Sequence, residues 1–79
     1  MRWHFSFISH EGKIYTYAYS REGSPLDGKI VFNEVTQHIY IEACSDDKPY
    51  GKRATDMAIE HFWKVVREAF PKERQVDCG

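Results

Sequence analysis

The hydrophobic pattern of this chain changes its period once, from two residues to about 3.6. Four runs before residue 45 alternate large apolar residues with polar or small ones, as strands with one buried face do. Lys52 to Phe70 instead gathers its apolar residues on one side of a helical wheel, and Pro71 ends it. The order ββββα predicts a two-layer α+β fold, in which one C-terminal helix packs on one face of a mainly antiparallel four-stranded sheet.

The four runs are separated by segments rich in turn-forming residues. They span residues 2–8, 13–20, 29–32 and 38–44, and Glu11-Gly12 is the expected tight turn of the first hairpin. In the second hairpin, a loop over residues 33–38 pairs Phe32 with Ile39 and Ile30 with Ile41. Both hairpins then have one strongly apolar face. A simple meander is favoured, although the loop over residues 21–28 leaves another strand order open.

The first hairpin decides which side of its second strand is buried. With Glu11-Gly12 as the loop, Phe7 opposes Thr16, and the tyrosines at positions 15, 17 and 19 oppose Ile8, Ser6 and His4. A shift by one residue would exchange the two faces. In this register the helix covers Trp3, Phe5, Phe7, Ile14, Thr16, Ala18, Ile30, Phe32, Ile39, Ile41 and Ala43. The helix contributes Ala54, Ala58, Phe62, Val65, Val66 and Ala69.

The other face of this predicted sheet has no element to cover it. It is aromatic, with basic residues near the strand ends, and tyrosine is favoured at contact surfaces. The predicted binding face contains Tyr15, Tyr17, Tyr19, Tyr40, His4, Lys13, Arg21 and His38. A solvated face without a partner is the plain alternative, because tyrosine also suits a half-exposed strand.

Three functions are compatible with such a face. The first is a non-enzymatic interaction domain that forms a homodimer or binds another protein. The alternative is single-stranded nucleic acid, whose bases could stack on the tyrosines while Lys13 and Arg21 meet phosphates. An enzyme using His4, His38, Glu42 or Cys44 is disfavoured, because His38 and Cys44 lie about 20 Å apart along one strand. We therefore expect no catalysis, no cofactor and no metal site.

Composition sets the remaining expectations. The 79 residues suffice for one domain, expected over residues 1–71, with a flexible tail over residues 72–79. A net charge of −1 gives no general case for nucleic acid or an anionic membrane. No apolar run reaches the roughly 18 residues of a membrane span. The two cysteines, Cys44 and Cys78, do not resemble a disulfide framework, so a cytoplasmic protein is expected.

Overall fold

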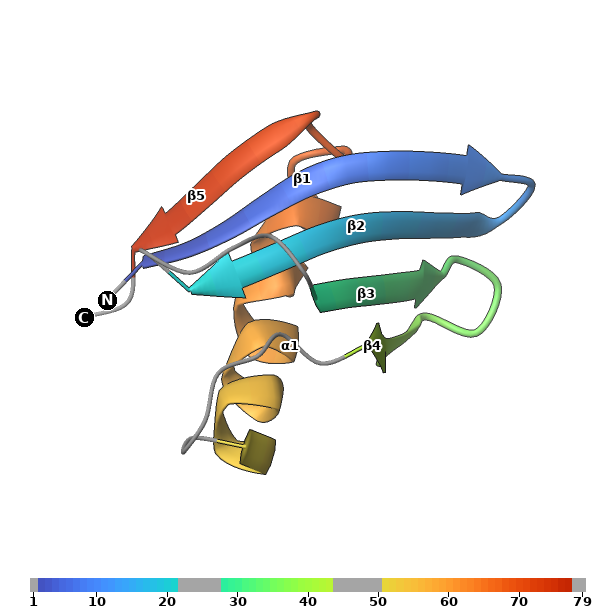
Figure 1. Cartoon of the computed structure of the whole chain (residues 1–79). Helices are drawn as coiled ribbons and strands as arrows, with labels where there is room; N and C mark the ends of the chain where they lie inside the picture. The colour runs from blue at the N-terminus through green and yellow to red at the C-terminus, as the bar shows by residue number, and fades with distance from the viewer. Residues whose placement is uncertain (1, 22–27, 44–50, 78–79) are drawn as a thin grey trace.

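The computed structural model describes residues 2–21, 28–43 and 51–77, which form a two-layer α+β arrangement (Figure 1). The sheet has five strands in the order β4-β3-β2-β1-β5, and all neighbouring strands are antiparallel. The strands are β1 (Arg2–Glu11), β2 (Ile14–Arg21), β3 (Gly28–Asn33), β4 (His38–Ala43) and β5 (Glu73–Asp77). The predicted fold class and the meander of the first four strands are confirmed, with five strands rather than four.

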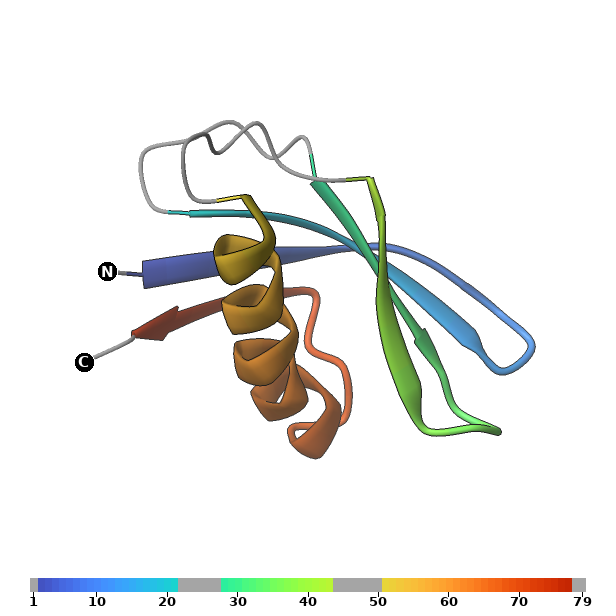
Figure 2. The same cartoon turned by 90° about the horizontal axis from the view of Figure 1, so that it is seen from below.

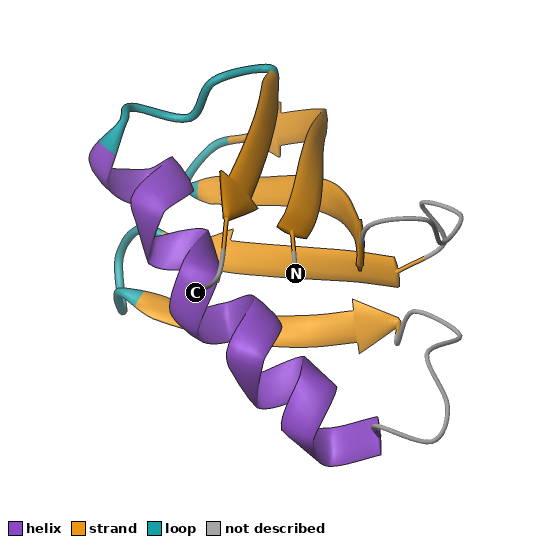
Figure 3. Cartoon of the chain, turned by 90° about the vertical axis from the view of Figure 1, so that its left-hand side faces the viewer, coloured by secondary structure: helices purple, strands orange, loops and turns teal. Residues whose placement is uncertain are grey.

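One helix, α1 (Gly51–Arg67), crosses one face of this sheet diagonally (Figure 3). Its residues Ala58, Phe62 and Val65 are fully buried, as the helical period predicted, and Val66 packs against them. Phe62 makes edge-to-face contacts with Phe5 of β1 and Tyr17 of β2. In the described part of the chain, no helix is both long enough and apolar enough to cross a membrane.

The fifth strand corrects the predicted C-terminus. Residues 73–77, assigned above to a flexible tail, form β5 beside β1, where Val76 lies opposite Trp3. Val76 is buried, and Arg74 makes a two-pronged contact with Glu68 through bonds of 2.9 and 3.0 Å. The strand was missed because Val76 is its single apolar residue, so no alternating pattern marks it. Cys44 and Cys78, discussed above, lie outside the described residues.

The first hairpin has a different register from the predicted one. Its turn is Gly12-Lys13, with Glu11 opposite Ile14, and Gly12 has a φ of 59°. A β-bulge between Phe7 and Ser9 then shifts the pairing by one residue. Beyond the bulge, Phe5 opposes Tyr19 and Phe7 opposes Tyr17. The bulge therefore puts the aromatic residues of both strands on one face.

This register places the tyrosines of β2 in the core. Tyr17 is 0% exposed and Tyr19 is 2% exposed, packed with Trp3, Phe5 and Phe62. The prediction that Ile14, Thr16 and Ala18 face the helix is wrong, since residues of that parity point to the other side of β2. The physical reason is area: two tyrosine rings remove much more apolar surface from water than an alanine and a threonine do.

The second hairpin agrees with the sequence prediction. Phe32 opposes Ile39 and Ile30 opposes Ile41, with Ile30, Phe32 and Ile39 buried. The side chain of Asn33 opens the turn by accepting hydrogen bonds from the backbone N–H groups of Val35 and Thr36, at 2.9 and 3.2 Å. The large apolar residues of the two strands share one face, and the pairing is regular from Ile30 to Asn33. The register shifts once, between Lys29 and Ile30, where Ala43 rather than Glu42 lies opposite Lys29.

The end of α1 is a Schellman motif that lacks the usual glycine. The N–H of Phe70 donates to the carbonyl of Val65 at 3.0 Å, and that of Ala69 donates to Val66 at 3.2 Å. Ala69 and Phe70 have φ values of 62° and 60°, which are unfavourable for residues with a side chain. The helix therefore ends at Arg67 rather than Phe70, and Ala69 is exposed rather than in the core.

Candidate functional site

The predicted binding face does not exist as one surface. Tyr17 and Tyr19 lie in the core beneath α1, so they are not available to a partner of the folded chain. The hydroxyl of Tyr17 donates a hydrogen bond of 2.6 Å to the carbonyl of Pro71. Burial, and to a lesser degree the neighbouring Tyr15, raises the pKa of Tyr17 to about 12. These two tyrosines have a structural role, and the prediction that they lie on the uncovered face is wrong.

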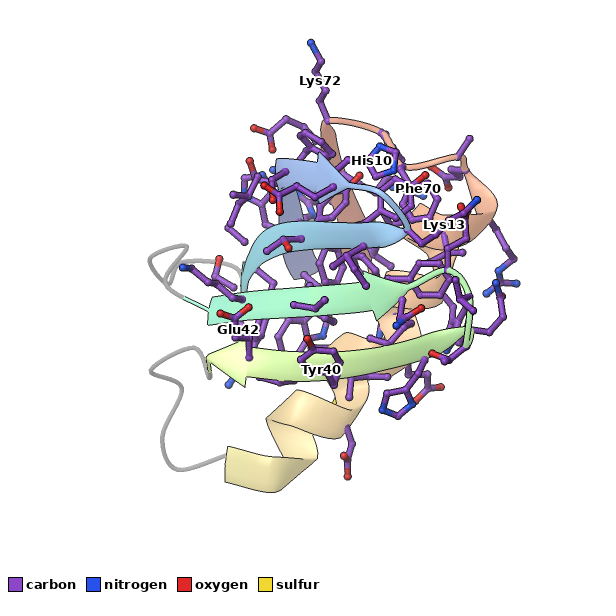
Figure 4. The ribbon with its side chains drawn as sticks, turned by 90° about the vertical axis from the view of Figure 1, so that its right-hand side faces the viewer. His10, Lys13, Tyr40, Glu42, Phe70 and Lys72 are labelled. Atoms are coloured by element: carbon purple, nitrogen blue, oxygen red, sulfur yellow. The ribbon has the colours of Figure 1, made fainter. Side chains whose placement is uncertain are left out.

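Tyr15 belongs to a closed aromatic cluster at the end of the first hairpin. Its ring is stacked between His10, at a centroid distance of 4.0 Å, and Phe70, at 3.7 Å. The Tyr15 hydroxyl lies 3.4 Å from Glu34 Oε2, and Lys13 Nζ lies 3.4 Å from Glu34 Oε1. Burial and the nearby Glu34 carboxylate raise the pKa of Tyr15. Figure 4 shows His10, Lys13 and Phe70 at this end of the sheet. Both faces of the Tyr15 ring are thus occupied by other rings.

His4 and Arg21 are separated from this cluster. His4 Nε2 lies 2.9 Å from Glu73 Oε2, and Ser6 Oγ donates to Glu73 Oε1 at 3.2 Å. The carboxylate stands between the hydroxyl and the imidazole, whereas nucleophilic triads need the imidazole between the other two groups. Arg21 is half-buried at the end of β2, opposite Trp3. The contacts of His4 and Ser6 with Glu73 join β1 to β5.

The remaining predicted residues, His38 and Tyr40, lie together on β4. Their rings are stacked with centroids 6.2 Å apart, and Tyr40 is 44% exposed. They share with Glu42 the sheet face that α1 does not cover, called the open face below (Figure 4). Tyr40 is directly opposite Val31, which is buried although it too faces away from the helix. On the open face, Tyr40 therefore lies beside a buried apolar side chain.

The outer side of β4 is the second part of this candidate site. β4 is the last strand in the sheet order, and no described strand pairs with its outer side, called the β4 edge below. In Figure 2, which views the molecule from below, no other described segment lies in front of β4. Figures 1 and 3 show that the first turns of α1 extend past β4. A further strand placed beside β4 would therefore lie next to the first turns of α1.

Sequence reasoning identified His38 and Tyr40 but missed the edge. The signal was present, because the next element described after β4 is a helix and not a strand. His10 and Phe70 were also missed as partners of Tyr15. Phe70 is 55 positions from Tyr15, and nothing in the local pattern connects them. Contacts of this kind depend on the path of the chain after α1.

Within residues 2–21, 28–43 and 51–77, no group of three or more His, Cys, Asp or Glu side chains is placed to hold a metal ion. The site therefore consists of a backbone edge, an exposed aromatic ring and two polar side chains. Comparison with known proteins adds no relative, since no protein-family model, curated protein or solved structure matches this chain.

Proposed function

We propose that this chain is a non-enzymatic interaction domain, which binds an extended segment of a protein as an additional strand beside β4. The observation that carries the proposal is the composition of the β4 edge. Natural proteins protect edge strands with lysine, proline, inward charges or bulges. β4 reads His-Ile-Tyr-Ile-Glu-Ala, with no proline, no lysine and one formal charge, and its single irregularity in pairing with β3 lies at Glu42, after the regular stretch from His38 to Ile41. An edge left in this state is a ready template for strand addition.

The side chains of β4 support both faces of an added strand. Ile39 and Ile41 point toward the helix layer, while His38, Tyr40 and Glu42 point to the open face. Backbone hydrogen bonds would supply affinity, and contacts with alternate side chains would supply specificity. Tyr40 is the expected anchor, because a half-exposed aromatic ring offers contact area at little cost in conformational entropy. The part of α1 that extends past β4 would cover the helix-facing side of the added strand.

The nucleic-acid alternative loses its main support. It relied on a row of three tyrosines that could stack bases, and Tyr17 and Tyr19 are buried while both ring faces of Tyr15 are covered. A single exposed ring, Tyr40, remains from the predicted set. Sequence-independent binding of single strands ordinarily uses successive stacking residues along a basic groove. Strand addition needs no such platform.

The proposal is tested by selecting binders without assuming their sequence. A displayed library of random ten-residue peptides is selected on the immobilised protein, and the binders are mapped by amide NMR shifts. We expect shift changes and slowed amide exchange in residues 38–42, and binding weakened at least tenfold by Tyr40→Lys. The matched control is Gln75→Lys, an exposed position on the other edge strand, which should bind normally. When the chain is monomeric under the conditions of the selection, a selection without binders, or binders that map away from β4, would contradict the proposal.

A further inference from the structure

We propose that the strand bound by β4 is β4 of a second copy of this chain, antiparallel about a two-fold axis that passes beside Tyr40. This inference rests on the proposed function and names its partner. Three features of the β4 edge carry it: the direction of its free backbone groups, the order of its charges, and the nature of the opposite edge of the sheet.

The backbone restricts the possible registers. In an antiparallel strand, only every second residue directs its N–H and C=O toward a given side. Two copies of one strand can therefore pair only if residues of equal parity oppose each other. A two-fold axis then places one residue opposite itself. β4 pairs regularly with β3 from His38 to Ile41, and the register shifts at Glu42. A register centred on Tyr40 pairs residues 38–42 of the two copies, with the irregular position at its end, whereas one centred on Ile41 pairs residues 39–43 and has that position inside it. A register centred on Ile39 pairs fewer residues of β4.

The side chains select the register centred on Tyr40. It sets His38 opposite Glu42 of the second copy and, by symmetry, Glu42 opposite His38 of that copy. An imidazole N–H can donate to the carboxylate whether or not the ring is charged. On the other side Ile39 meets Ile41 of the second copy, which continues the apolar layer beneath α1. The register centred on Ile41 instead opposes Glu42 with a tyrosine and forms no such pair.

The symmetry also explains how the assembly closes. A two-fold axis perpendicular to the sheet gives one sheet of ten strands, five from each copy, with both helices on the same face. Its two outer strands are then both β5, whose sequence Glu-Arg-Gln-Val-Asp has three formal charges in five residues. Such an edge resists further pairing. The assembly is therefore a closed dimer and not a filament.

The test is the molecular mass in solution across a wide range of protein concentrations. The wild-type chain is expected to reach twice its 9.3 kDa mass at high concentration. Tyr40→Lys should keep it at one chain, because two lysines would oppose each other at the axis. His38→Glu and Glu42→Lys should each raise the dissociation constant at least tenfold. The double variant H38E/E42K should return it to within about threefold of the wild type, since opposite charges face each other again.

Controls separate association from folding and this inference from the proposed function. Gln75→Lys should leave the dimer unchanged, and circular dichroism should show that each variant is folded. A wild-type chain that stays at 9.3 kDa overturns the inference, while the peptide selection independently decides whether the β4 edge binds protein. A dimer insensitive to Tyr40→Lys also overturns it. A third outcome is that Tyr40→Lys disrupts the dimer but H38E/E42K associates no better than the single variants. In that case the β4 edge remains the interface and the register centred on Tyr40 is overturned.

Discussion

The two edge strands of this sheet, β4 and β5, are opposite in character. β5 has charged residues and is fixed by side chains, through Arg74 to Glu68 of the helix end and through Glu73 to His4 and Ser6 of β1. β4 has isoleucines and tyrosine, and is held by its pairing with β3 and by packing of Ile39 in the core. Both are five or six residues long. Length therefore does not distinguish them.

The difference shows how one small sheet can protect one edge and leave the other competent to pair. The side-chain bonds of β5 keep it in place despite its single buried apolar residue. Its charges make addition of another strand unfavourable. β4 is held instead by its pairing with β3 and by the packing of Ile39 in the core. As a result, the backbone N–H and C=O groups on the outer side of β4 are left unprotected.

Deleting residues 73–79 should have the largest effect, because it removes the protected edge altogether. Val76 is buried opposite Trp3, and its loss re-exposes Trp3 and Phe5. We expect the free energy of unfolding to fall by about 3 kcal/mol or more. Urea denaturation measures this, with deletion of residues 78–79 alone as the control. An unchanged midpoint for the longer deletion would show that residues 72–79 behave as the predicted tail.

Gly28→Ala should weaken the other half of the sheet. Gly28 begins β3 opposite Tyr19, and an added Cβ would overlap with the buried Tyr19 ring. Such overpacking costs about 1–3 kcal/mol, which thermal unfolding would measure. Gly12→Asn is the control, because the space around Gly12 is open and asparagine tolerates its positive φ. Equal stability of Gly28→Ala and wild type would mean that Tyr19 is free to move.

Tyr17→Phe tests the bond that joins the sheet to the segment before β5. Losing the donor to the Pro71 carbonyl should cost about 1 kcal/mol at neutral pH. The folded-state pKa of Tyr17, about 12, exceeds its usual 10.0, so its stabilising contribution is complete below pH 10 and is lost as the pH rises toward 12. Urea titrations from about pH 8 to 12 should show a shallower alkaline loss in Tyr17→Phe. Parallel curves would exclude this linkage.

Ala69→Gly should stabilise the connection between α1 and β5. Ala69 has a φ of 62° at the position of the Schellman motif where glycine is usual. We expect a gain of about 0.5–1 kcal/mol, after allowing for the greater freedom of glycine in the unfolded chain. Ala58→Gly, within the buried side of the helix, should instead destabilise. The thermal midpoint of each variant measures these changes in stability. A lower midpoint for Ala69→Gly than for the wild type would contradict the idea that the backbone of Ala69 is strained.

Tyr40→Lys and Gln75→Lys should have the smallest effect on folding. Both side chains are exposed, so at concentrations where the chain is monomeric each should change unfolding by about 0.5 kcal/mol or less. Their difference should appear only in association, which Tyr40→Lys removes. Chemical denaturation at high dilution, repeated at high concentration, measures the two effects separately. A large loss for Tyr40→Lys at high dilution would mean that this ring supports the monomer.

Much of the architecture was predictable from periodicity alone. In the second hairpin the isoleucines and Phe32 share one parity, so Phe32 and Ile39 could be paired from the sequence. In the first hairpin both parities of β2 contain residues that a core accepts, Ile14 and Ala18 on one side and three tyrosines on the other. The β-bulge between Phe7 and Ser9 determines which side of β2 is buried, and no residue pattern in the sequence predicts this bulge.

The site was predictable only in part for the same reason. His38 and Tyr40 lie on the strand whose register was correct, and they remain on the open face. Tyr17 and Tyr19 were assigned to that face through the first hairpin, where a shift of one residue reverses every side chain. The identity of the edge strands depended on β5, whose pairing with β1 follows from tertiary packing of Val76 and from side-chain bonds rather than from local alternation.

The pairing of β1 with β5 also has a consequence for the order in which the molecule can assemble during synthesis. Trp3 and Val76 are neighbours in the sheet but lie at opposite ends of the chain. While the ribosome is still making α1, the aromatic strand β1 has a bare outer side, and its partner has not been translated. A nascent or prematurely ended chain would thus present Trp3 and Phe5 to its surroundings, and would be a natural substrate for chaperones and proteases.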